Sequence, residues 1–214
     1  MKQAAAAVFL TAFSAGSGLL AQQADQATPI SLGIVLDTSG SMRDKMPLTH
    51  QVLSELLRDS DLRDEIALIE GSNHPVVLAE FGSDAEKLLA YVHPTEAKGA
   101  SALMDAVHLS IQVTSTGRSE RKVILLISDG VDSASNYTAA EVENSIRNAG
   151  IRMLVLGVGT PIVEDAEALQ ELAGRASLGQ LAENVGGRRF ELQYPSDVSR
   201  IVAELRAAMR ESAL

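Results

Sequence analysis

Four side chains with oxygen donors follow two strongly apolar segments of the chain: Asp37, Ser39, Ser41 and Asp129. The first three lie just after the segment 30–36, and the fourth lies just after the segment 123–127. If these segments are neighbouring parallel strands, the four side chains lie at one edge of a sheet, where open α/β sheets bind ligands. Carboxylates and hydroxyls with no His or Cys close by in the sequence favour a hard cation such as Mg²⁺. The pattern therefore indicates a divalent metal site.

The two serines also allow a simpler interpretation. Ser39-Gly40-Ser41 could form an ordinary turn after a strand, with the Ser41 hydroxyl bonded to nearby backbone groups. The motif alone does not distinguish this turn from a metal site, so the elements that position it have to be considered.

Strand and helix signals alternate along the chain. Apolar runs typical of buried strands occupy residues 30–36, 65–69, 76–81, 123–127, 153–156 and 188–192. Gly71-Ser72-Asn73, between the second and third runs, predicts a hairpin with an edge strand. The sequence therefore predicts a single α/β domain with a doubly wound, mostly parallel, Rossmann-like sheet, one antiparallel edge strand and helices on both faces.

Helices are predicted to begin at or near Pro47, Ser83, Ser101, Thr138, Glu164 and Val198. Pro is favoured at the first position of a helix. Ser83 and Thr138 are each followed three residues later by Glu, which fits a capping box. The segment 164–185 is expected to form one helix, or two helices with a break near Gly174 or Gly179, because glycine weakens a helix.

The composition excludes several functional classes. The chain has 28 Asp and Glu residues against 18 Lys and Arg residues, a formal net charge of −10. Because this charge repels a phosphate backbone, no nucleic-acid partner is expected. Cys is absent from the sequence, which rules out disulfides, thiolate metal ligands and a Cys nucleophile.

The first residues have the pattern of a signal peptide. Lys2 precedes a mostly apolar run, residues 4–20, and small residues follow up to Ala21. We therefore expect a signal peptide over residues 1–21, cleaved after Ala21, and a short polar tether over residues 22–29. An uncleaved membrane anchor is the alternative. Cleavage predicts an exported protein, periplasmic or extracellular, with no transmembrane segment in the mature chain.

Three motifs together resemble the von Willebrand factor A domain family. Asp37-Thr38-Ser39-Gly40-Ser41 resembles its DxSxS signature, and residues 127–132 (Ile-Ser-Asp-Gly-Val-Asp) resemble its second acidic loop. Residues 99–106 (Gly-Ala-Ser-Ala-Leu-Met-Asp-Ala) resemble the Gly-Gly-Thr-Ala-Leu-x-Asp-Ala segment of a secreted bacterial branch. The motifs occur in the family's order, and the resemblance implies a von Willebrand factor A domain over residues 30–211.

The resemblance implies a metal-ion-dependent adhesion site with five ligating residues: Asp37, Ser39, Ser41, Ser101 and Asp129. The serines would bind Mg²⁺ or Mn²⁺ through their hydroxyls, and the two acids would act mainly through bound waters. The ion would then keep an open position for an Asp or Glu carboxylate of a partner protein. Ser101 stands where the family usually has Thr, and the alternative for Ser101 is a plain helix N-cap.

A metal-dependent hydrolase of the phosphatase type, with Asp37 as its nucleophile, is the competing interpretation. Such enzymes carry a second acid two residues after the nucleophile, where this chain has Ser39. No Lys follows a later strand at a position suited to hold a phosphoryl group, and no Gly-x-Ser-x-Gly elbow is present around Ser39 or Ser41. We therefore expect a protein-binding module and not an enzyme.

Other polar residues near the motifs are expected to be structural. Asp105 should lie in the first turn of its helix, where the helix dipole favours an acid, and Asp132 should be a solvated or loop-ordering acid. The four His residues are scattered without metal-ligand spacing, so we expect them to be structural or exposed.

Overall fold

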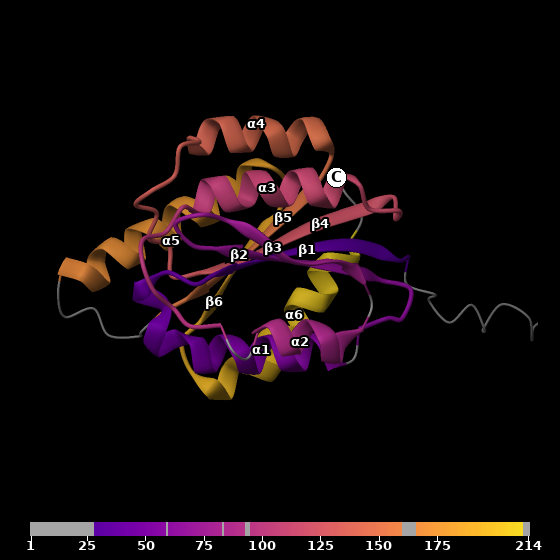
Figure 1. Ribbon diagram of the computed structural model, residues 1–214, viewed down its shortest axis with the longest axis horizontal. Coiled ribbons are helices and arrows are strands. Elements are labelled where there is room, and N and C mark those ends of the chain that lie inside the picture. Colours follow the sequence, from indigo (N-terminus) through magenta and orange to yellow (C-terminus); the bar gives the residue numbers. More distant parts are fainter. Residues whose placement is uncertain (1–27, 59, 83, 93–94, 160–165, 212–214) are drawn as a thin grey trace, which may run out of the picture.

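The computed structural model describes residues 28–58, 60–82, 84–92, 95–159 and 166–211 (Figure 1). The predicted signal peptide, most of the predicted tether, the predicted capping residue Ser83 and the predicted helix start Glu164 lie outside the described residues. No helix in the described part of the chain has the length and apolar character needed to cross a membrane.

In the described residues, six strands form one sheet in the order β3-β2-β1-β4-β5-β6. Their bounds are β1 Ile30–Asp37, β2 Glu65–Gly71, β3 Val76–Gly82, β4 Arg121–Ser128, β5 Arg152–Val158 and β6 Arg188–Leu192. All neighbours are parallel except β3, which pairs antiparallel with β2 at the edge. The predicted fold class is therefore confirmed, including the antiparallel edge strand. The strand order reverses between β1 and β4, which is the switch point where such sheets bind ligands.

Helices cover both faces of the sheet (Figure 1). They are α1 Met46–Arg58, α2 Ala85–Val92, α3 Leu103–Ser115, α4 Ala139–Ala149, α5 Ala166–Asn184 and α6 Val198–Arg210. Helices α1, α2 and α6 pack on one face, and α3, α4 and α5 pack on the other. Short 3-10 helices precede α1 and α6: η1 Gly40–Lys45 and η2 Pro195–Asp197.

The central strands are apolar on both sides because both faces are covered. Ile34 and Leu36 of β1 belong to the core under α1 and α6, whereas Val35 between them belongs to the core under α3, α4 and α5. Each is at most 1% exposed. Burial of each such side chain contributes about 1.5–3 kcal/mol, which fixes the register of β1 and hence the place where it ends.

The helix signals in the sequence are confirmed in part. Thr138 and Glu141 form the predicted capping box at the start of α4. The first helix begins one residue earlier than predicted, at Met46, because the chain enters it from η1. Of the two alternatives for 164–185, the single helix is observed, because α5 runs without interruption through Gly174 and Gly179.

Candidate metal centre

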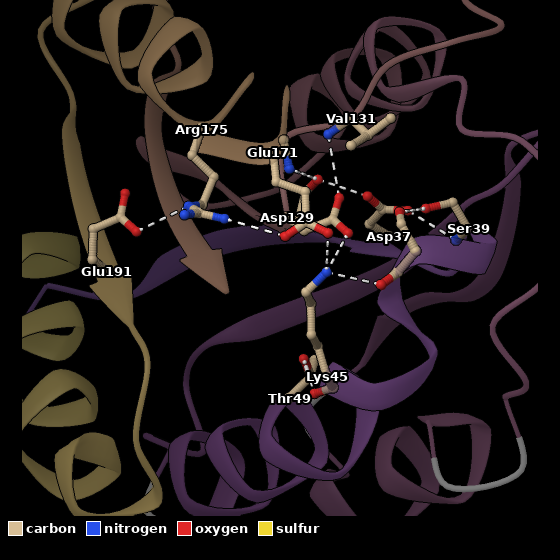
Figure 2. A network of polar contacts seen from close by, with 12 residues as sticks. Asp37, Ser39, Lys45, Thr49, Asp129, Val131, Glu171, Arg175 and Glu191 are labelled. Carbon is tan, nitrogen blue, oxygen red and sulfur yellow. Dashed lines mark hydrogen bonds and ion pairs between the residues drawn. The ribbon is translucent and has the colours of Figure 1, made fainter. Parts of the chain in front are cut away.

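Asp37 and Asp129 lie at the switch point of the sheet. Asp37 is the last residue of β1, and Asp129 directly follows β4, the parallel neighbour of β1. Both residues are fully buried. The Ser128 hydroxyl, at the end of β4, donates to Asp37 Oδ2 at 2.6 Å, which ties the two strand ends together. The expectation that these two acids end neighbouring strands is confirmed (Figure 2).

Burial raises the pKa of Asp37 to about 6. Hydrogen bonds from the Ser128 hydroxyl and the Ser39 backbone N–H act in the opposite direction, and the negative charge of Asp129 raises the pKa further. A carboxylate in this state is stabilised by a nearby positive charge. The electrostatics around Asp37 therefore favour a cation.

The hydroxyl loop after β1 is fixed by its own backbone bonds. Ser39 N–H donates to Asp37 Oδ1 at 2.9 Å, and the Ser39 and Ser41 hydroxyl oxygens lie 3.2 Å apart. Gly40 N–H donates to the carbonyl of Gly99 at 3.0 Å. The loop is thus held against the segment that leads to Ser101.

Ser101 carries a buried hydroxyl without a hydrogen-bond partner among the described residues. The residue is 1% exposed, and its carbonyl accepts bonds of 2.9 Å from the backbone N–H groups of Ser133 and Ala134. Its segment is therefore bonded both to the loop after β1 and to the loop after β4. The N-cap alternative for Ser101 is wrong, because Ala102 is the N-cap of α3 and no side chain caps that end.

A buried lysine that no sequence motif indicated lies beside Asp129 and the loop after β1. Lys45, at the end of η1, is 9% exposed. Its ammonium donates to Asp129 Oδ2 at 2.9 Å, to Glu171 Oε1 at 2.6 Å and to the Ser41 carbonyl at 2.9 Å (Figure 2). Burial lowers the pKa of Lys45, but the bonds to Glu171 and Asp129 outweigh burial and hold the pKa above its usual value. Lys45 therefore remains charged.

The charged contacts continue from Lys45 across the sheet edge. Glu171 and Arg175 lie one turn apart on α5, with Arg175 Nη1 3.6 Å from Glu171 Oε2. Arg175 Nε also lies 3.3 Å from Glu191 Oε2 on β6 (Figure 2). Arg175 is 2% exposed. Sequence reasoning missed Lys45, Glu171 and Arg175, because no local spacing links residues that are 126 positions apart, as Lys45 and Glu171 are.

The remaining polar residues near the motifs have the structural roles expected of them. Asp132 Oδ1 accepts a bond of 2.8 Å from the Ser135 hydroxyl, which orders the loop after β4. Asp105, in the first turn of α3, accepts bonds from the backbone N–H groups of Asn136 at 2.8 Å and Tyr137 at 2.9 Å. His108 stacks on Tyr137 with ring centroids 3.9 Å apart.

The chemistry of the proposed ligands is that of hydroxyl and carboxylate oxygens. Within the described ranges, no group of three or more His, Cys, Asp or Glu side chains could hold a metal ion. The set expected here has only two acids, Asp37 and Asp129, and takes its other donors from serines. What the structure does bring to one edge is the two acids, the Ser39–Ser41 loop bonded to Asp37, and the Ser101 segment bonded to both loops.

Residues 32–131 match the family model described as the von Willebrand factor type A domain. The matched range includes all five residues expected to ligate a metal: Asp37, Ser39, Ser41, Ser101 and Asp129. No curated protein sequence matches the chain at a significant level.

Solved structures resemble the chain across most of its length. BatB from Bacteroides thetaiotaomicron, described as a conserved hypothetical protein, superposes with a TM-score of 0.67 at 20% identity, over 85% of this chain and 100% of BatB. An aerotolerance-related membrane protein from Bacteroides fragilis gives a TM-score of 0.69 at 18% identity, over 84% and 98%. The pilus adhesin SpaC from Lactobacillus rhamnosus GG gives 0.66 at 12% identity, over 86% and 30%. At these identities the likeness concerns the fold alone. The chain thus has the fold of a von Willebrand factor type A domain, and its residues 32–131 are similar in sequence to the model of that family.

Proposed function

We propose that this domain is an exported protein-binding module, of the secreted bacterial branch of the family, with a metal-ion-dependent adhesion site. Mg²⁺, or Mn²⁺, would be held by Asp37, Ser39, Ser41, Ser101 and Asp129. When bound, the ion supplies an electrophilic centre that can accept a carboxylate oxygen from an Asp or Glu of a partner protein. The observation that carries the proposal is the buried hydroxyl of Ser101, which has no hydrogen-bond partner in the part of the chain that the structure describes.

An unsatisfied buried hydroxyl costs about 1–3 kcal/mol, so such a group needs an explanation. Ser101 lies in a segment bonded to the Ser39–Ser41 loop on one side and to the loop after Asp129 on the other. A cation ligated by the Ser101 oxygen would satisfy this hydroxyl and would also offset the charge of the buried Asp37 carboxylate. Two independent features of the site thus fit one divalent ion.

The two acids are held in place by other protein groups. Asp37 accepts bonds from Ser39 N–H and from the Ser128 hydroxyl, one on each carboxylate oxygen. Asp129 accepts from Val131 N–H at 3.2 Å on one oxygen and from Lys45 on the other. With every carboxylate oxygen already bonded, this arrangement supports acids that act on the ion mainly through water. The ion then keeps much of its charge for a partner.

The same bonds argue against the phosphatase alternative. A nucleophilic carboxylate needs an ionised oxygen with a free path to its substrate. Both Asp37 oxygens accept hydrogen bonds from protein groups, so neither has a free path to a substrate. Position 39 holds a Ser, which adds a hydroxyl in place of the second acid. These features support binding over hydrolysis.

The fold neighbours are in keeping with a binding role. SpaC is a pilus adhesin, and PilB from Streptococcus sanguinis, a minor pilin, superposes with a TM-score of 0.65 at 15% identity over 88% of this chain and 63% of PilB. The signal-peptide pattern over residues 1–21 supports export, which would expose the domain to proteins of the envelope or the exterior. The partner class that follows is a protein with an accessible acidic side chain.

The experiment is a Mn²⁺ titration of Ser101→Ala by calorimetry, with Ser110→Ala as the matched control. Ser110 is a fully buried serine of the adjacent helix α3, but its hydroxyl donates to the Val107 carbonyl at 3.0 Å. We expect Ser101→Ala to weaken Mn²⁺ binding by about tenfold or more without loss of metal-free stability, because the hydroxyl removed has no hydrogen-bond partner within the described ranges. Ser110→Ala should bind Mn²⁺ as the wild type does. Unchanged binding by Ser101→Ala would contradict the proposal.

A further inference from the structure

Lys45 is a fixed positive charge beside the proposed metal site. An ammonium group has three N–H donors, and the three bonds of Lys45 go to Ser41 O, Asp129 Oδ2 and Glu171 Oε1. The side chain is about one tenth exposed, so solvent screens this charge only weakly. One of the two proposed acidic ligands therefore already has a cation bonded to it.

Glu171 cancels only part of that charge. Glu171 shares its other oxygen with Arg175, whose guanidinium also faces Glu191. The ammonium of Lys45 lies 2.6 Å from Glu171 and 2.9 Å from Asp129, whereas Arg175 lies 3.6 Å from Glu171, so the charge of Lys45 acts on both acids. The formal charge of Asp37, Asp129 and Lys45 together is −1, whereas the two acids alone carry −2.

We propose that Lys45 lowers the affinity of the site for its own divalent ion, so that the ion retains more of its positive charge for the partner's carboxylate. This inference rests on the proposed function. It adds a residue, outside the five ligands, that sets the affinity of the site for its metal ion. Lys45 is a positioning and charge-setting residue and does not itself contact the partner. Its bond to the Ser41 carbonyl also joins the hydroxyl loop to the loop that carries Asp129.

The two actions of Lys45 have opposite consequences for metal affinity. If Lys45 served only to join the two loops, its removal would loosen the site and weaken metal binding. If its charge dominates, removal of the charge strengthens metal binding, because repulsion between the ammonium and the ion is lost. We infer that the charge dominates, since both acids remain anchored by bonds that do not involve Lys45, from Ser39 and Ser128 to Asp37 and from Val131 to Asp129.

Calorimetric titration with Mn²⁺ alone tests this. Lys45→Met and Lys45→Gln should both bind Mn²⁺ tighter than the wild type, by about tenfold. In metal-free buffer both variants should melt at a lower temperature than the wild type, because Asp129 and Glu171 lose their cation. Added Mn²⁺ should then raise the melting temperature of the variants by more than it raises that of the wild type. Lys122→Met is the control. Lys122 donates to the carbonyls of Ser115 and Gly117 at the opposite end of β4, so this variant should bind Mn²⁺ with the affinity of the wild type.

Glu171→Gln is a second variant that keeps the test open if the lysine variants fold poorly. It should change the Mn²⁺ affinity in the opposite direction. It removes the acid that shares Lys45, so more of the ammonium charge acts on the site, and Mn²⁺ binding should weaken about threefold or more. Equal or weaker binding by both Lys45 variants, or tighter binding by Glu171→Gln, would overturn the inference while leaving the proposed function intact. A wild-type protein that binds no Mn²⁺ would overturn both.

Discussion

Gly174 of α5 lies in backbone contact with Gly130, the residue that follows Asp129. A Cβ atom added to Gly174 would overlap the Gly130 carbonyl, and one added to Gly130 would overlap the backbone at Arg175. Gly130 also has a φ of +98°, which disfavours a side chain. Because neither glycine has a side chain, the backbone of α5 contacts the loop that follows Asp129. This contact places Glu171 and Arg175 of α5 around that loop.

Gly174→Ala should therefore destabilise the protein although alanine is the better helix former. The backbone of α5 or of the loop must move, at a cost of about 1–3 kcal/mol. Urea denaturation measures this loss. Gly179→Ala in the same helix is the matched control, because its Cβ would meet the flexible side chain of Arg189. There the gain in helix propensity, about 0.5–1 kcal/mol, should leave stability equal or higher. Similar losses in both variants would count against a specific role for the contact.

This contact also shows where sequence reasoning reached its limit. The fold followed from apolar runs and helical periodicity, and the acids Asp37 and Asp129 followed from their places at strand ends. Helix propensity is local and leaves open whether the helix breaks at Gly174, whereas the packing that requires glycine there comes from a loop 44 residues earlier in the chain. Lys45 and Glu171 were missed for the same reason, since their bond depends on how two helices face each other.

Asp105 gives a prediction on pH. Burial raises its pKa, but the hydrogen bonds from the Tyr137 and Asn136 backbones and the Asn136 side chain outweigh burial and hold the pKa below its ordinary value. A depressed pKa in the folded state stabilises the protein fully above the unfolded pKa, near 4, and this contribution is lost as the pH falls through the folded pKa. Asp105→Asn should thus cost about 1–2 kcal/mol at pH 7.

The difference between wild type and Asp105→Asn should shrink as the pH falls below about 4. Thermal melts in metal-free buffer from pH 7 to pH 3 measure this difference. Asp44→Asn, at an exposed position of η1, should track the wild type throughout. A difference that stays constant down to pH 3 would mean that the charge of Asp105 is not what orders the loop.

Asp37→Asn should have opposite effects without and with metal. The Asp37 carboxylate is buried beside Asp129, and burial raises its pKa to about 6. At neutral pH its ionised form therefore disfavours folding, so in EDTA the variant should melt roughly 2–6 °C higher, as a gain of about 1–1.5 kcal/mol implies. With Mg²⁺ at about ten times its Kd, the wild type should gain about 1.4 kcal/mol, or roughly 3–5 °C.

The Asn variant should lose that metal-induced rise, because a neutral amide offers the ion no charge. Differential scanning calorimetry in EDTA and in Mg²⁺ gives both measurements on the same samples. An equal metal-induced rise in Asp37→Asn would place the ion somewhere else on the protein.

Ser41→Ala tests whether metal and partner binding form one unit. The Ser41 hydroxyl lies 3.2 Å from that of Ser39, and the Ser41 carbonyl would still accept from Lys45 after the substitution, so the loop should keep its backbone. A partner can be captured from the native envelope with Mg²⁺ and with EDTA in parallel. Ser41→Ala and neutralisation of the partner's acid should each weaken binding by about tenfold or more. Their combined effect should be well below the sum of the two, because each breaks the same coordination.

Ser72→Ala, in the loop after β2, is the control and should bind the partner as the wild type does. Additive losses, partner binding in EDTA, or turnover of a phosphate or ester substrate that Asp37→Asn abolishes would each contradict a metal-bridged binding module.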